Sequence, residues 1–117
     1  MKERFNAEVK DVPGKEGVKI VELEGEIDIS NSQKILDIML PLIEEGNKFF
    51  IIDFSQLKHI NSSGMFNFLR CFSKLKEKGG WLRFVNIGKA IREVLDSLGI
   101  TRVFTIYGSV EEALREE

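Results

Sequence analysis

The sequence has little of what disulfide-bonded, metal-binding and membrane-spanning proteins need. Its 117 residues include one cysteine, Cys71, and one histidine, His59, and no apolar run reaches the roughly 18 residues of a membrane-spanning helix. A lone cysteine excludes an internal disulfide, and one nitrogen and one sulfur ligand cannot close a metal site. The charged start, MKERFNAEVK, lacks the apolar core of a signal peptide. We therefore expect a cytoplasmic protein with no metal ion and no membrane contact.

An excess of positive charge and the nucleotide-binding motifs are also missing. The formal net charge is −2, so no overall field attracts nucleic acid. Neither GxGxxG nor GxxxxGK[ST] occurs, and nothing in the sequence supplies an oxyanion hole for a nucleophile built from Ser62 and His59. These absences predict a protein that is not an enzyme, needs no cofactor and makes no direct contact with nucleic acid.

What is present is the composition of one globular domain, residues 1–117, with 43% hydrophobic and 31% charged residues. Periodicity and turn residues predict a hairpin of strands at 5–9 and 18–25, a helix at 31–45, a central strand at 48–54, a helix from 61 to Gly79-Gly80, a strand at 81–85, a helix over 91–98, a strand at 102–107 and a short final helix. Strands that alternate with helices imply parallel crossovers. The expected fold is α/β, with a mixed central sheet of about five strands flanked by about four helices.

Capping patterns refine two of these helices. Ser30 and Gln33 form a capping-box pattern that predicts the start of helix 31–45. Pro41 inside that helix predicts either a kink or a helix that tolerates strain late in its length. Ser109 and Glu112 repeat the pattern at the final helix. We expect His59 to be a loop or surface residue before the helix that starts at 61.

Asp53 is a candidate acidic site because it stands at the predicted carboxyl end of the central strand, where α/β folds bind ligands. A phospho-accepting aspartate of the receiver type would also need an acidic cluster, for which only Glu26 and Asp28 are available, and a lysine opposite. A role for Asp53 in a turn or a cap is the favoured interpretation.

The stretch Asn61-Ser62-Ser63-Gly64 raises a different question, because a helix start needs one capping residue and this stretch offers three. Free backbone amides and the helix dipole at this position tolerate a phosphoryl group. Such a group adds about −1.5 to −2 charges to any surface that docks there. A switch operated by phosphorylation of a serine is therefore chemically sensible.

These residues resemble a known family. The turn Asn61-Ser62-Ser63-Gly64 follows an apolar strand and a short loop, FFIIDFSQLKHI, and is similar to an Asp-Ser-Ser/Thr-Gly turn at a helix start. Gly25-Glu26-Ile27-Asp28 matches an earlier Gly-Glu-Leu/Ile-Asp segment, and LDSLGI at 95–100 matches a later Leu-x-x-x-Gly-Leu/Ile pattern. With three motifs in the right order, the chain resembles the STAS domain of bacterial anti-sigma factor antagonists.

The resemblance implies a partner switch that regulates transcription. The unphosphorylated domain would bind an anti-sigma factor that is also a serine kinase, and so free a sigma factor. That kinase would phosphorylate Ser62, with Ser63 as the alternate, and a serine phosphatase would reverse the step, while ATP and magnesium would belong to the kinase. The partner-binding residues that the resemblance implies are Asp28, Asn61, Ser62, Ser63, Gly64, Met65 and Phe66.

Two residues depart from the family pattern. Asn61 stands where the family has aspartate, which keeps the capping geometry and removes a negative charge beside the acceptor. Phe66 is bulky where relatives are commonly small, so it is either buried or widens an apolar docking surface beside Met65. The alternative interpretation is a STAS-like scaffold, never phosphorylated, or a module that binds a small anionic or lipidic ligand at the same helix start.

Overall fold

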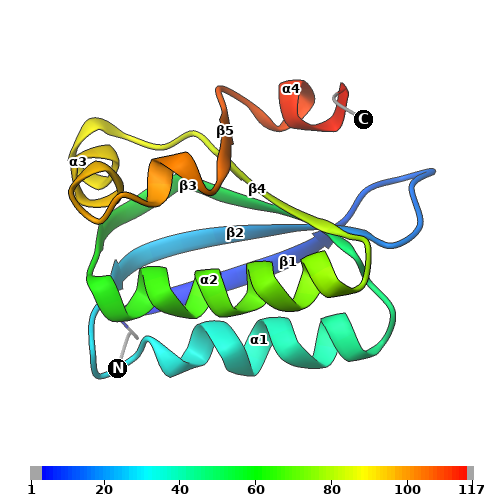
Figure 1. Cartoon of the computed structure of the whole chain (residues 1–117), viewed down its shortest axis with the longest axis horizontal. Helices are drawn as coiled ribbons and strands as arrows, with labels where there is room; N and C mark the ends of the chain where they lie inside the picture. Colours follow the sequence, from blue (N-terminus) through cyan, green and yellow to red (C-terminus); the bar gives the residue numbers. More distant parts are fainter. Residues whose placement is uncertain (1–3, 116–117) are drawn as a thin grey trace.

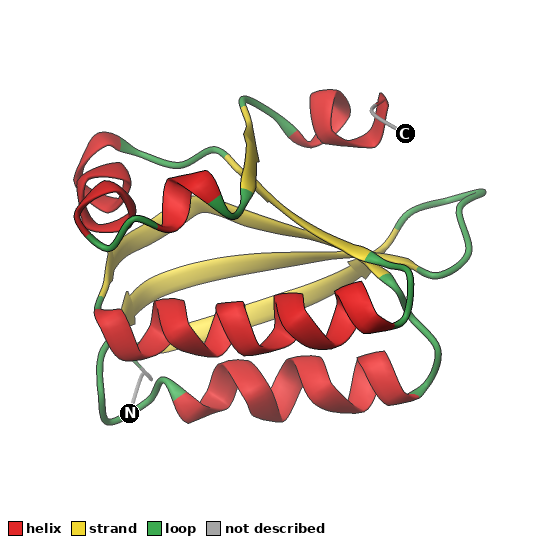
Figure 2. Ribbon diagram, in the orientation of Figure 1, coloured by secondary structure: helices red, strands yellow, loops and turns green. Residues whose placement is uncertain are grey.

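A five-stranded mixed sheet forms the centre of the molecule (Figures 1 and 2). The computed structural model describes residues 4–115. The elements are β1 (Phe5–Asp11), β2 (Val18–Ile27), α1 (Gln33–Glu44), β3 (Phe49–Ile60), α2 (Ser62–Glu77), β4 (Trp81–Val85), α3 (Lys89–Ser97), the 3-10 turn η1 (Ile100–Arg102), β5 (Thr105–Tyr107) and α4 (Val110–Arg115). The strands lie in the order β1-β2-β3-β4-β5, with β1 antiparallel to β2 and all other pairs parallel. The predicted α/β fold with its hairpin, five strands and four helices is confirmed.

Helices cover both faces of this sheet. The helices α1 and α2 lie side by side against one face, and α4 lies on the other side (Figure 1). The main core lies between the sheet and α1 and α2, and buried side chains of α3 and η1 join it. A smaller cluster around Ile51, Val85 and Ala113 lies under α4. Burial of these two apolar faces is what holds the layers together.

The central strand β3 is longer than the periodicity predicted. It continues past residue 54 to Ile60 because β2 stays paired with it, with Ile27 opposite Ile60. The pairing contains two register shifts, so the buried residues in this half, Phe54, Leu57 and Ile60, recur every third position and hide the two-residue period of a strand. The short loop expected before residue 61 is therefore wrong. His59 belongs to the strand, and its predicted position at the surface is confirmed.

Two other element boundaries differ from expectation. Helix α1 begins at Gln33 after Ser32, and the predicted capping box is wrong because the Ser30 hydroxyl and amide both donate to the Asp28 carboxylate. The strand expected at 102–107 is confined to Thr105–Tyr107, since residues 100–102 form a 3-10 turn that buries Ile100. The predicted cap of α4 is confirmed, because the Glu112 amide donates to the Ser109 hydroxyl at 3.1 Å.

Candidate functional site

The start of α2 is capped by one residue of the Asn61–Gly64 turn. Asn61 adopts an extended backbone, and its side-chain oxygen accepts from the Gly64 amide at 3.1 Å and from the Ser63 hydroxyl at 2.8 Å. This is the geometry by which an asparagine satisfies free amides at a helix start. Because Asn61 is neutral, the cap brings no negative charge to the turn.

Ser62 takes no part in the hydrogen bonds of this cap. It is the first residue of α2 and is exposed, and within residues 4–115 its hydroxyl makes no hydrogen bond. Ser63, in contrast, is half-buried and its hydroxyl is engaged by Asn61. The first turn of α2 contains no acidic residue. The geometry therefore presents one free hydroxyl at a positive helix end that has no carboxylate of its own.

The turn is fastened to the end of β2. The Asn61 amide donates to the Ile27 carbonyl at 3.2 Å, and a Cβ on Gly64 would lie 2.8 Å from Cγ2 of Ile27 and 2.9 Å from Cγ1 of Ile60. Only a residue without a side chain fits there without displacing the core. Gly64 is therefore a packing residue, which brings the start of α2 against the strand that leads into the neighbouring loop.

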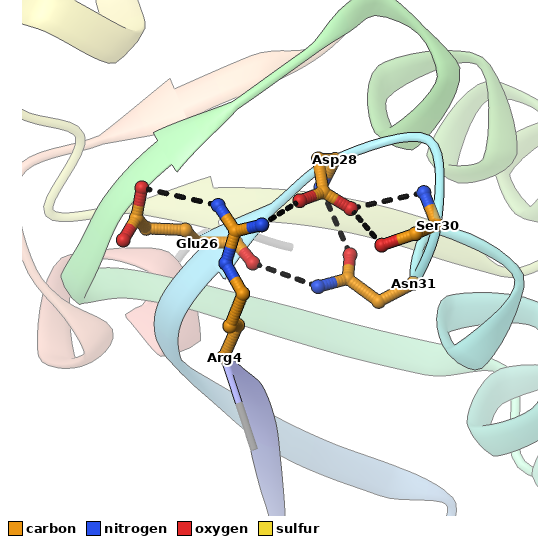
Figure 3. A network of polar contacts seen from close by, with 5 residues as sticks. All are labelled: Arg4, Glu26, Asp28, Ser30 and Asn31. Atoms are coloured by element: carbon orange, nitrogen blue, oxygen red, sulfur yellow. Dashed lines mark hydrogen bonds and ion pairs between the residues drawn. The ribbon is translucent and has the colours of Figure 1, made fainter. Parts of the chain in front are cut away.

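That neighbouring loop, residues 28–32, is built around Asp28 (Figure 3). One carboxylate oxygen accepts from the Ser30 amide at 2.9 Å and the Ser30 hydroxyl at 2.5 Å, and the other pairs with the Arg4 guanidinium at 2.7 Å. Asn31 accepts from the Asp28 amide at 2.9 Å and donates to the Glu26 carbonyl at 3.0 Å. The hydrogen bond from the Ser30 hydroxyl, with smaller help from Arg4, lowers the pKa of Asp28. Asp28 thus uses both oxygens to hold its own loop.

The two segments are linked again one turn further along. The Asn67 side chain in α2 donates to the Ser32 carbonyl at 2.9 Å. Together with the contacts of Ile27, this places the Ser62 turn beside the loop at 28–32, at one end of the molecule (Figure 1). The structure therefore brings together all the residues that the family resemblance implied.

The apolar residues of the site are divided between core and surface. Met65 is 0% exposed, so its side chain belongs to the core and offers no docking surface, contrary to the expectation. Phe66 is 49% exposed. Sequence reasoning missed Ile29, which is 82% exposed, and Arg4, which orders the loop. No local signal marked Ile29 as exposed, because it lies two residues after the buried Ile27 and so continues the alternation of a strand.

Asp53 does not form a receiver-type site. It lies inside β3 rather than at its end and is buried, and its carboxylate accepts from the Ser55 amide at 2.9 Å and the Asn86 side chain at 3.1 Å. Within residues 4–115 no three His, Cys, Asp or Glu side chains are grouped so as to hold a metal ion. The predicted role of Asp53 in a turn or a cap is also wrong, because this strand residue joins its own strand at Ser55 to Asn86, the residue that follows β4.

Two further features bear on chemistry elsewhere in the chain. Burial raises the pKa of the Cys71 thiol to about 12, which keeps it protonated and unreactive. None of the helices in the described part of the chain is both long and apolar enough to cross a membrane.

Comparison with known proteins agrees with this architecture. The sequence model of the STAS domain family matches residues 9–113, so the chain belongs to the STAS domain family. The chain is 27% identical to the anti-sigma F factor antagonist of Paenibacillus polymyxa over 86% of each protein. It is also 26% identical to the anti-sigma-B factor antagonist of Bacillus subtilis over 78% of this chain and 83% of that protein.

Solved structures share the fold. An anti-sigma factor antagonist from Mycobacterium paratuberculosis superposes with a TM-score of 0.82 at 23% identity, covering 94% of this chain and 91% of that chain. The anti-sigma factor antagonist SpoIIAA in its unphosphorylated form gives 0.79 at 22% identity over 93% of each chain. The phosphorylated form of SpoIIAA from Bacillus gives 0.72, also at 22% identity, over 93% of this chain and 96% of that chain.

Proposed function

We propose that this protein is an anti-sigma factor antagonist switched by phosphorylation of Ser62. In the unphosphorylated state it binds an anti-sigma factor that is also a serine kinase, and so releases a sigma factor for transcription. The kinase transfers the γ-phosphoryl group of ATP to the Ser62 hydroxyl, with Ser63 as the alternate acceptor, and the complex separates. A serine phosphatase restores the binding state by hydrolysis.

The observation that carries this proposal is the free hydroxyl of Ser62 at the start of α2. A kinase needs an accessible hydroxyl, and among the four serines of the two segments only Ser62 is exposed without a hydrogen bond inside residues 4–115. Ser32 is buried, Ser63 is held by Asn61, and Ser30 donates to Asp28. The names of the relatives support the role of an anti-sigma factor antagonist, and SpoIIAA, which shares the fold, has a phosphorylated form.

The switch follows from where the charge is added. A phosphoryl group brings about −1.5 to −2 charges, which are tolerated in the free domain by the helix dipole and by water. Inside an interface the same group loses its water, and desolvation without a new partner costs several kcal/mol. A cost of about 4 kcal/mol weakens binding about a thousandfold.

The test uses the purified anti-sigma factor kinase of the source organism, with ATP and magnesium. Incubation with the kinase is expected to add one phosphoryl group, which fragmentation mass spectrometry locates on Ser62; Ser62→Ala removes the signal, whereas Ser63→Ala keeps it. In calorimetric titrations Ser62→Ala binds the kinase like the wild type, and Ser62→Asp loses binding about a thousandfold.

Other outcomes assign other functions. Equal binding by wild type, Ser62→Ala and Ser62→Asp, with no phosphorylation, contradicts the switch and leaves the scaffold or small-ligand module. A phosphoryl group on Asp53, abolished by Asp53→Asn, contradicts it in favour of a receiver-type protein.

A further inference from the structure

Two of the exposed large apolar side chains belong to the two segments that meet at the candidate site. In residues 4–115 such side chains are Val9, Ile29, Phe66 and Val103. Ile29 lies in the loop at 28–32, and Phe66 lies in α2 one turn after Ser62. Single exposed apolar residues are common on protein surfaces, but two on neighbouring segments beside an accessible hydroxyl indicate an interaction site.

The fold holds both side chains outward on ordered segments. Ile29 is flanked by Asp28 and Ser30, which are joined by two hydrogen bonds and clamped by Arg4 (Figure 3). Phe66 follows the buried Met65 on a helix tied to the Ser32 carbonyl through Asn67. Because the backbone that carries both residues is already ordered, binding a partner there requires neither segment to fold.

The exposed row of α2 continues from Phe66 as positive charge. Phe66, Arg70, Lys74 and Lys78 are spaced by four residues and all are exposed. None of the three cations forms an ion pair within residues 4–115. The helix C-terminus stabilises Lys74 and Lys78, but Arg70 lies too far from it, and like charges four residues apart disfavour the helix. The row therefore suits an acidic partner surface.

We propose that Ile29 and Phe66 are the apolar anchors that hold the anti-sigma factor, which presents an apolar pocket bordered by acidic side chains facing Arg70 and Lys74. This inference rests on the proposed function and adds the chemistry of recognition to it. A protein fits better than nucleic acid or membrane, because three cations in one row on a chain of net charge −2 offer few phosphate contacts.

The arrangement also accounts for the strength of the switch. Ser62 and Phe66 are four residues apart on one helix, so they share a face. A phosphoryl group on Ser62 would lie beside the Phe66 contact, on the side away from Arg70 and Lys74, and would lose its water when the partner covers Phe66. Desolvation of the phosphoryl group then opposes the same contact that Phe66 makes.

The experiment measures binding of the purified anti-sigma factor kinase to Ile29→Ser and Phe66→Ser by surface plasmon resonance. Each substitution is expected to weaken binding at least about tenfold, mainly through faster dissociation. The matched controls Val9→Ser and Val103→Ser also remove exposed apolar side chains but lie outside the two segments, and they are expected to change affinity less than about twofold. Circular dichroism melts confirm that all four variants are folded.

Charge is tested separately with two double variants of equal net charge. Arg70→Glu with Lys74→Glu is expected to slow association and reduce its dependence on salt, whereas Lys15→Glu with Lys48→Glu leaves both unchanged. If the two double variants have equal association rates with equal dependence on salt, the inference that the partner presents acidic side chains to Arg70 and Lys74 is overturned.

The remaining outcomes separate this inference from the proposed function. Unchanged affinity of Ile29→Ser and Phe66→Ser overturns the anchors, even where Ser62→Asp abolishes binding and the switch stands. If Ile29→Ser and Phe66→Ser both lose binding while Ser62→Asp has no effect, the anchors stand and the switch is overturned. Dimerisation of the wild type that is lost in Ile29→Ser, or binding to phosphatidylglycerol vesicles that is lost in Arg70→Glu with Lys74→Glu, assigns the surface elsewhere and overturns the inference.

Discussion

The starts of α1 and α2 contain nearly the same residues and use them in opposite ways. Ser30-Asn31-Ser32 precedes α1, and Asn61-Ser62-Ser63 opens α2; both follow strands that run parallel in the sheet. At α1 the polar side chains turn back to the loop, where Ser30 and Asn31 bind Asp28 and the backbone before it. At α2 a single residue, Asn61, completes the cap.

The difference shows that a hydroxyl becomes available when its neighbour satisfies the backbone for it. Asp28 recruits Ser30, so the exposed hydroxyl at α1 lies against a carboxylate, where a phosphoryl group would meet negative charge. Asn61 accepts a hydrogen bond from the Ser63 hydroxyl, so Ser62 stays free at a helix start whose first turn has no acidic side chain. The same two residue types, serine and asparagine, therefore build a structural loop in one place and an accessible acceptor in the other.

The largest loss of stability is expected from Gly25→Ala. Gly25 lies against the backbone of Arg4, the residue that pairs with Asp28 in the loop before α1. A Cβ on Gly25 would lie 2.0 Å from the Arg4 carbonyl, and the φ of +96° is one that other residues rarely adopt. Backbone strain plus the clash should lower the free energy of unfolding by roughly 3–4 kcal/mol. Urea denaturation measures this.

The control is Gly14→Ala in the hairpin turn, where φ is +78° and the space is open. It carries strain alone and should cost roughly 1 kcal/mol. Equal losses in the two variants would show that the approach of Arg4 to β2 does not matter for stability.

A smaller loss of stability is expected from removing the capping side chains at the two helix starts. Asn61→Ala removes the acceptor for the Gly64 amide and should destabilise the protein by about 1 kcal/mol. Ser32→Ala, at the equivalent position of α1, removes a side chain that makes no cap hydrogen bond and should cost less than about 0.5 kcal/mol. Chemical denaturation of both variants gives the ranking, and the reverse order would contradict the assignment of the caps.

The smallest effect concerns pH. The pKa of Asp28 is lowered in the folded protein, so its contribution to loop stability is complete above the ordinary aspartate value, near pH 4, and is lost as the pH falls through the lowered value. A carboxyl NMR titration should place Asp28 below the same residue in a peptide of residues 26–31. Ser30→Ala should raise the midpoint more than Arg4→Ala does; an unchanged midpoint in Ser30→Ala would remove the hydroxyl as the main cause.

Much of the fold and part of the site followed from local patterns. The apolar run FFIID identified the centre of the sheet, and the spacing of Met65, Phe68 and Leu75 identified α2, because periodicity reflects which face of an element is buried. The helix start at Asn61 followed from capping chemistry. Asp53 was placed at a strand end because the register shifts of β3 break the two-residue period.

Local sequence patterns were sufficient to establish the order of elements, the α/β class and the position of the serine turn, since these depend on interactions between residues close in the chain. Long-range packing places Met65 in the core and Phe66 at the surface, exposes Ile29, and pairs Arg4 with Asp28. Those outcomes depend on contacts between segments that are distant in sequence, such as Gly64 on Ile27 and Asn67 on Ser32. No local pattern encodes them, because the partner of each residue is chosen by how the layers pack.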